Sequence, residues 1–156
     1  MNLSRFLRDD RIDLHLDDRF DEEDNPATVE SLAEHMAGLL ELSDDIVNPT
    51  KLRLDLINRE KRAPSLLGMG IALPHVRTLQ ARKLVIAVGI SEEGLDLETP
   101  DGEPVRIAIA IVGPPYDDKL YLQVYKRLSE RLIEEGAVET ILAAESEGEV
   151  VRALSS

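Results

Sequence analysis

The sequence contains no cysteine and no tryptophan, and only five of its 156 residues are phenylalanine or tyrosine. The absence of cysteine excludes a disulfide framework, a thiolate nucleophile and sulfur-ligated metal sites. With so few aromatic rings, stacking on nucleic-acid bases or on sugars is poorly supported. The core of this protein must therefore be aliphatic.

Basic residues are also scarce. The sequence has 18 Lys and Arg and 31 Asp and Glu, which gives a formal net charge of −13. A surface of this sign repels a polyanion, so nucleic acid is excluded as a partner. Two interpretations of the acidic surface stay open. In the first, the acidic surface complements a basic protein partner; in the second, it is an adaptation to a saline cytoplasm.

Long apolar runs are missing too, since no stretch approaches the roughly 20 residues that a membrane-spanning helix needs. The first ten residues lack the apolar centre of a signal peptide, so we expect a cytoplasmic protein with no direct membrane insertion. A hydrophobic fraction of 43% in a chain of this length is typical of a folded globular protein. We therefore predict one domain over residues 1–156.

Helix boundaries are the clearest local signal. Asn25-Pro26 and Asn48-Pro49 each place a capping side chain before a proline suited to the first helical position. We predict one helix from there to about residue 42, and a second to about residue 62, where Ala63-Pro64 disfavours helical geometry. After Asp117 or Asp118, leucine and valine at every fourth position predict a third long helix, and a last helical region follows Gly136.

Two β-branched runs, residues 83–90 and 104–112, are typical of strands, and Asp101-Gly102 between them favours a turn. Their almost unbroken apolar character predicts a sheet covered by helices on at least one face. The predicted fold class is α/β, a single-domain sandwich with a mixed central β-sheet flanked by helices.

The segment from Arg59 to Arg77 carries the chemistry. Gly68 and Gly70 suit a tight backbone path, residues 71–73 suit a short core strand, and Pro74 fixes the backbone immediately before His75. An oriented, exposed imidazole can accept a phosphoryl group and release it again. Its phosphate oxygens would need hydrogen-bond donors, and the candidates are Arg59, Arg77 and the hydroxyl of Ser65.

These residues resemble the mannitol/fructose-type enzyme IIA domains of the bacterial phosphoenolpyruvate-dependent phosphotransferase system, including the nitrogen-regulatory branch. The resemblance rests on Arg59-Glu60, Ser65 and the run Gly68-Met-Gly70-Ile-Ala-Leu-Pro-His75, and extends more weakly over residues 3–151. It implies that His75 accepts phosphate from a histidine phosphocarrier protein and that Arg59 steadies the phosphohistidine. Ser65, Gly68 and Gly70 are further candidates for the phosphate pocket. The resemblance implies no metal or organic cofactor.

Two departures from the family pattern affect the rate and stability of phosphorylation. Where the family usually has a second active-site histidine, this chain has Tyr121, which can donate a hydrogen bond but cannot become a cation. Tyr121 could equally be a packing residue of its helix, and Lys119 is a candidate to replace the missing charge. The segment Ala63–Leu66 is stiffer and less polar than the small, hydroxylated loop of the family.

Two functional hypotheses remain. The first is a phosphoryl carrier with a regulatory role or a role in sugar uptake, whose partners are the phosphocarrier protein and an enzyme IIB or a regulatory target. The second is a regulatory protein-binding module that keeps the fold without relaying phosphate. An acidic surface around His75 would favour a basic carrier face in the first case. His15 and His35 lack metal-ligand spacing, so we assign neither to a metal.

Overall fold

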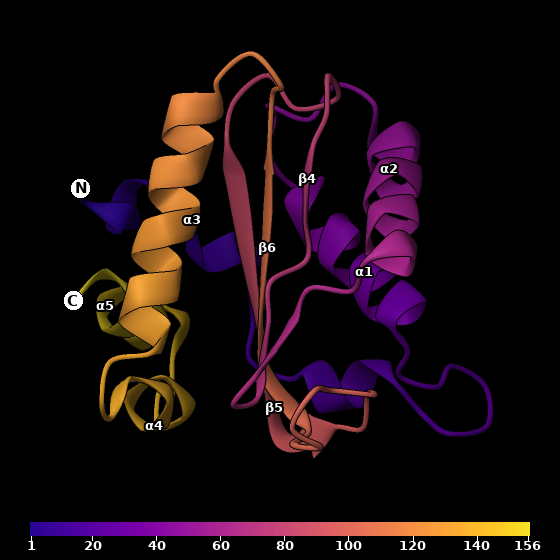
Figure 1. Cartoon of the computed structure of the whole chain (residues 1–156), viewed down its shortest axis with the longest axis vertical. Coiled ribbons are helices and arrows are strands. Elements are labelled where there is room, and N and C mark those ends of the chain that lie inside the picture. Colours follow the sequence, from indigo (N-terminus) through magenta and orange to yellow (C-terminus); the bar gives the residue numbers. More distant parts are fainter.

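A mixed sheet of six strands lies between two layers of helices (Figure 1). This arrangement comes from a computed structural model that describes all residues 1–156. Helices α1 (Val29–Leu40) and α2 (Pro49–Arg62) cover one face, and α3 (Asp118–Leu132), α4 (Ala137–Leu142) and α5 (Glu147–Ser155) cover the other. The predicted α/β sandwich is confirmed, with helices on both faces of the sheet.

Strands β5 (Val85–Leu95) and β6 (Val105–Gly113) form the antiparallel centre of the sheet, joined through the predicted turn at Asp101-Gly102. β1 (Ile12–Asp13) pairs with β5 in parallel, and β3 (Ile71–Ala72) and β4 (His75–Arg77) pair in parallel with β6. β2 (Leu66–Gly68) completes an antiparallel hairpin with β3. His75 therefore begins a short strand held beside the central strand of the molecule.

The side chains of β6 explain its unbroken apolar run. Ile107, Ile109 and Ile111 belong to the core beneath α3 to α5, whereas Ala108 and Ala110 belong to the core beneath α1 and α2. Successive side chains of a strand point to opposite faces. Both faces are buried here, so alternation of large and small apolar residues replaces alternation of apolar and polar ones.

The two predicted proline helix starts have different outcomes. Asn48 caps α2 by accepting from the backbone nitrogen of Lys51, and Pro49 occupies the first turn, as predicted. The other prediction is wrong, because α1 begins at Val29. Thr28 and Ser31 form a reciprocal capping box there, which satisfies more free backbone groups than a single Asn25 cap would. Asn25 instead donates to the carbonyl of Arg19 within the preceding loop.

The C-terminal half contains two short helices where one helical region was predicted. Gly136, at a positive φ of 79°, precedes α4, and Ser146 caps α5 by accepting from the backbone nitrogen of Glu149. Three short 3₁₀ helices, Leu3–Phe6, Asp9–Arg11 and Leu16–Arg19, lead into and out of β1. None of the helices has the length and apolar character required to cross a bilayer.

Candidate active site

The ring of His75 is held by two groups that define its tautomer. Nδ1 lies 2.7 Å from the carbonyl oxygen of Leu73, and Nε2 lies 3.3 Å from Nη2 of Arg59. A carbonyl oxygen can only accept and a guanidinium can only donate, so the proton is on Nδ1 and the lone pair is on Nε2. The ring is partly exposed, and its nucleophilic nitrogen faces a cation.

Arg59 is positioned by the end of α2. Its Nη1 donates to the carbonyl of Ala63 at 2.6 Å, the residue at which the helix stops before Pro64. This bond leaves Nη2 directed at His75. The carbonyl at the predicted end of the helix thus also fixes the Arg59 guanidinium. This geometry is consistent with the prediction that Arg59 and His75 lie together.

Glu60 contributes to the candidate site, although the sequence analysis named it only as part of the Arg59-Glu60 motif and gave it no role. Its carboxylate is 3% exposed and accepts from the backbone nitrogen of Ser65 at 2.9 Å, from the Ser65 hydroxyl at 3.0 Å and from the backbone nitrogen of His75 at 3.3 Å. The available signal was its position, four residues after Leu56 and eight after Leu52 on the buried ridge of α2. A carboxylate on an apolar ridge requires buried partners.

Ser65 lies on the side of the ring opposite Arg59. Its hydroxyl donates to Glu60, and its oxygen lies 3.2 Å from Nδ1 of His75, where it can accept together with the Leu73 carbonyl. Ser65 is 8% exposed. The structure thus brings this predicted site residue to His75, but in a place that orients the ring rather than one that faces Nε2.

A shallow hollow of about 420 Å³ opens in front of His75. It is lined by Arg59, His75, Val76, Arg77, Tyr121, Leu122 and Tyr125. The ring of Tyr125 packs edge-on to the imidazole, with 5.1 Å between the ring centroids. Its place one helical turn after Tyr121 was the signal that could have identified it.

Tyr121 packs into the fold, and its hydroxyl is left without a partner. The ring packs beside Gly113, and the residue is only 5% exposed, as expected of a packing residue. Its hydroxyl is buried without any hydrogen-bond partner although the residue lines the hollow. Burial raises the pKa of the Tyr121 phenol, against the opposing effect of the nearby Arg77 and Arg59, so the hydroxyl keeps its proton at neutral pH.

Arg77 also lines the hollow, where its guanidinium carbon lies 5.6 Å from the Tyr121 ring centroid and its Nη1 pairs with Asp118. Lys119 is exposed on α3 and is not among the lining residues. Of the two predicted phosphate-pocket candidates Arg77 and Lys119, only Arg77 is thus brought to the hollow.

The glycine pair lies away from His75. Gly68 and Gly70 have φ values of 82° and 79° and form the turn between β2 and β3. Ile71 pairs with Ile107 of β6 whereas His75 pairs with Ile111, so the turn is at least four residues, or about 13 Å, along the sheet. These glycines make a hairpin possible, and the structure does not bring them into the hollow with His75.

The charge around His75 differs from the expected acidic surface. A second hollow, of about 760 Å³, adjoins the first and shares Val76 and Arg77 with it. Its basic lining residues are Lys51, Lys61, Arg62 and Arg77, and its one acidic lining residue is Asp55. The neighbourhood of the imidazole is therefore basic in a chain whose net charge is strongly negative.

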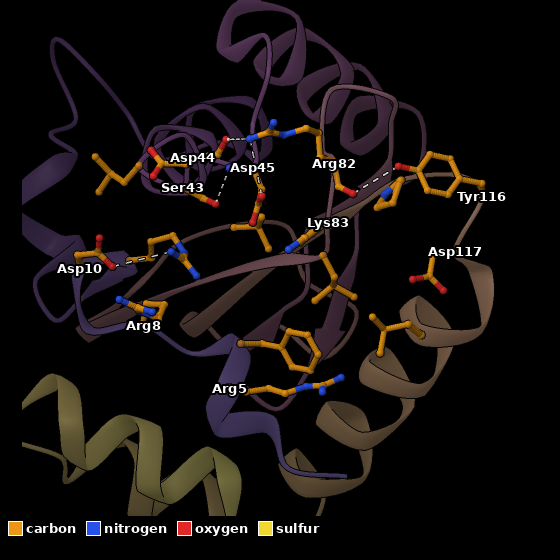
Figure 2. A pocket seen from close by; sticks show the side chains of 17 residues that line it. Arg5, Arg8, Asp10, Ser43, Asp44, Asp45, Arg82, Lys83, Tyr116 and Asp117 are labelled. Atoms are coloured by element: carbon orange, nitrogen blue, oxygen red, sulfur yellow. Dashed lines mark hydrogen bonds and ion pairs between the residues drawn. The ribbon is translucent and has the colours of Figure 1, made fainter.

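A third hollow, of about 680 Å³, is separate and has a balanced lining (Figure 2). Arg5, Arg8, Arg82 and Lys83 reach it together with Arg11, and so do the carboxylates of Asp10, Asp44, Asp45 and Asp117. It shares no residue with the hollow in front of His75.

The other two histidines lie away from the hollow in front of His75. His35 lies 2.7 Å from the buried carboxylate of Asp13, which also pairs with Arg19, and His15 is exposed just after β1. No group of three or more histidine and carboxylate side chains is arranged to hold a metal ion.

A family model described as "Phosphoenolpyruvate-dependent sugar phosphotransferase system, EIIA 2" matches residues 21–156. The chain belongs to this EIIA type 2 family. A fructose-specific EIIA component of Haloferax volcanii is 35% identical over 127 residues, which is 80% of each protein. The nitrogen regulatory protein IIA-Ntr of Neisseria meningitidis has the same fold, with a TM-score of 0.83 at 23% identity over 97% of this chain and 98% of that one.

EIIA type 2 sequences also occur within larger proteins. The fructose-specific EIIABC component of Bacillus subtilis is 29% identical over 122 residues, which cover 78% of this chain but 19% of that protein. The present chain thus spans about a fifth of that relative. Names from both the sugar and the nitrogen-regulatory branches stand among its relatives, in agreement with the resemblance found in the sequence.

Proposed function

We propose that this EIIA type 2 protein carries a phosphoryl group on Nε2 of His75, acting in the cytoplasm as a phosphotransferase component. The observation that carries the proposal is the orientation of the ring. Leu73 holds the proton on Nδ1, and Nε2 presents its lone pair to a partly exposed hollow beside the Arg59 guanidinium. Such a nitrogen is a nucleophile at neutral pH without an additional base.

The transfer is an in-line displacement. The Nε2 lone pair forms the new P–N bond as the P–N bond of a donor phosphohistidine breaks, and that electron pair stays on the donor nitrogen. Arg59 neutralises charge on the equatorial oxygens, and the buried hydroxyl of Tyr121 supplies a hydrogen bond that no protein group uses. The proton stays on Nδ1, hydrogen-bonded to the Leu73 carbonyl, so the ring leaves as a neutral imidazole in onward transfer.

The phosphate donor in this proposal is a histidine phosphocarrier protein. The acceptor is an enzyme IIB, consistent with a relative named as an EIIABC component, or a regulatory target, consistent with relatives named as nitrogen regulatory proteins. Gly68 and Gly70 have no part in the phosphate pocket of this proposal, because they shape a distant turn.

The test is phosphorylation by phosphoenolpyruvate, enzyme I and the phosphocarrier protein of the same cell. We expect the intact mass to increase by one acid-labile phosphoryl group in the wild-type protein and not in His75→Ala. An unmodified wild-type mass, in a mixture where the carrier itself becomes phosphorylated, would instead support the regulatory binding module.

A further inference from the structure

Three cations of the hollow beside His75 have no carboxylate partner within the protein. Lys51, Lys61 and Arg62 line it from α2, and none of them has a carboxylate within ion-pair distance. The one acidic lining residue, Asp55, accepts a hydrogen bond from the hydroxyl of Thr78 at 2.7 Å. These three unpaired cations lie on one helix of a chain in which acidic residues outnumber basic ones by 31 to 18.

In the hollow of Figure 2, by comparison, the cations lie among carboxylates. There Arg82 donates to the carbonyl of Asp44 and lies 3.9 Å from Asp45, and Arg11 lies 3.9 Å from Asp10. Five cations in that hollow are opposed by four lining carboxylates, whereas the four beside His75 are opposed by one lining carboxylate, Asp55, and by Asp118, which pairs with Arg77. The positive potential therefore concentrates on the side of the molecule that holds the nucleophile.

Apolar side chains accompany these cations. Leu79 in the basic hollow is 68% exposed, and Leu122 at the rim of the His75 hollow is 59% exposed. Exposed leucines make no favourable contact with a small free anion, whereas protein interfaces combine apolar contacts with a charged rim. The joined hollows thus have the composition of a protein-binding face.

We propose that the face formed by Lys51, Lys61, Arg62, Leu79 and Leu122 docks a phosphoryl donor protein whose contact surface is acidic. This inference rests on the proposed function and specifies the partner for His75. It reverses the arrangement expected from the net charge, in which an acidic face would meet a basic carrier. Complementary charge accelerates encounter and orients the partner's phosphohistidine toward the hollow.

The test compares two ways of phosphorylating His75. The double variant Lys61→Glu/Arg62→Glu receives phosphate either from the phosphocarrier protein of the same cell or from phosphoramidate, a small donor that needs no docking face. We expect transfer from the carrier to slow about ten-fold or more at low ionic strength, and the difference to shrink as salt is added. Labelling by phosphoramidate should keep its wild-type rate.

The matched control is Arg8→Glu/Arg152→Glu, which makes the same change in net charge at exposed, unpaired arginines outside both hollows beside His75. It should transfer phosphate from the carrier at the wild-type rate. Calorimetric binding of the unphosphorylated carrier should weaken only in the Lys61/Arg62 variant.

Three results would overturn the docking face: unchanged or faster transfer in the Lys61/Arg62 variant, an equal loss in the control, or an equal loss with phosphoramidate. If the wild-type protein is labelled by neither donor, the phosphoryl carrier proposal fails. The binding measurement then still decides whether an acidic partner uses this face.

Discussion

The buried carboxylate of Glu60 accepts a hydrogen bond from the backbone nitrogen of His75, at 3.3 Å, while its immediate neighbour Arg59 reaches the side chain of the same histidine. Two consecutive residues at the end of α2 thus contact His75, Glu60 at its backbone nitrogen and Arg59 at its ring. The carboxylate also ties down Ser65, whose oxygen lies beside Nδ1. Glu60 is therefore a positioning residue, which acts on the nucleophile through the backbone and through Ser65.

Replacing Glu60 by Gln should impair both stability and phosphorylation. The glutamine amide would place its own N–H donors against the backbone and hydroxyl donors that now bond to the Glu60 carboxylate. We therefore expect a loss of about 1 to 3 kcal/mol in the free energy of unfolding. The labelling rate of His75 by phosphoramidate should fall about ten-fold as the ring loses its orientation. Urea unfolding and intact-mass kinetics measure the two effects. Reduced stability with a wild-type labelling rate would show a structural role only.

Removal of the Arg59 guanidinium should act mainly on the chemistry. We expect Arg59→Ala to slow phosphorylation about 100-fold, as when one preorganised donor is removed from a charged transition state. Arg59→Lys should give an intermediate rate, because it keeps the charge without the planar fork. Rates come from quenched-flow mass spectrometry. An alanine variant that is as fast as the wild type would remove Arg59 from the site.

Tyr121→Phe isolates the unpartnered hydroxyl. Because that hydroxyl makes no hydrogen bond within the protein, its removal should leave the free energy of unfolding unchanged or raise it by up to about 1 kcal/mol. The phosphohistidine, in contrast, should hydrolyse several-fold faster without the donor. Tyr121→His should lengthen the lifetime again. If neither substitution changes the lifetime, Tyr121 is a packing residue alone.

Gly70→Ala tests the placement of the glycine turn. The position has a φ of 79°, and an added Cβ would lie 3.3 Å from the carbonyl oxygen of Pro104. We expect a loss of about 1 to 2 kcal/mol in stability from the left-handed backbone, with an unchanged rate of His75 labelling. Lys119→Ala should change neither quantity. A selective loss of phosphorylation in Gly70→Ala would restore the glycine to the phosphate pocket.

Asp13 makes stability depend on acid pH. Burial by itself would raise the pKa of the Asp13 carboxyl, but hydrogen bonds from His35 and Arg19 outweigh it and hold the pKa well below its usual range. Since the unfolded-state value is about 3.9, this stabilisation is complete above that pH and is lost as the pH falls toward the folded-state value.

Asp13→Asn should therefore be less stable than the wild type by about 3 kcal/mol at pH 7, with the difference shrinking below about pH 4. Denaturant unfolding at a series of pH values measures this. A constant difference in stability at all pH values would contradict this role of Asp13.

If residues 1–156 form one domain, as the sequence predicts, the whole chain should unfold in a single cooperative transition. Circular dichroism and hydrogen exchange should then report the same unfolding midpoint.

Much of the fold and the centre of the site could be read from local sequence. Asn48-Pro49 and Ala63-Pro64 bound α2 because capping and proline sterics act between near neighbours, and Pro74-His75 marked the proposed nucleophile. The start of α1 was missed since two competing caps lie within a few residues of each other, and the choice depends on what Asn25 contacts in the folded loop.

The sequence by itself determined that this chain forms an α/β sandwich and that a histidine follows a proline at a strand, because periodicity and covalent spacing carry that information. Only the tertiary structure decided that Glu60 is turned inward, that the Tyr121 hydroxyl lacks a partner, and that the glycines lie far from His75. It also decided the sign of the charge near His75. Net charge is a sum over all residues, whereas a docking partner meets only those that folding brings to one face.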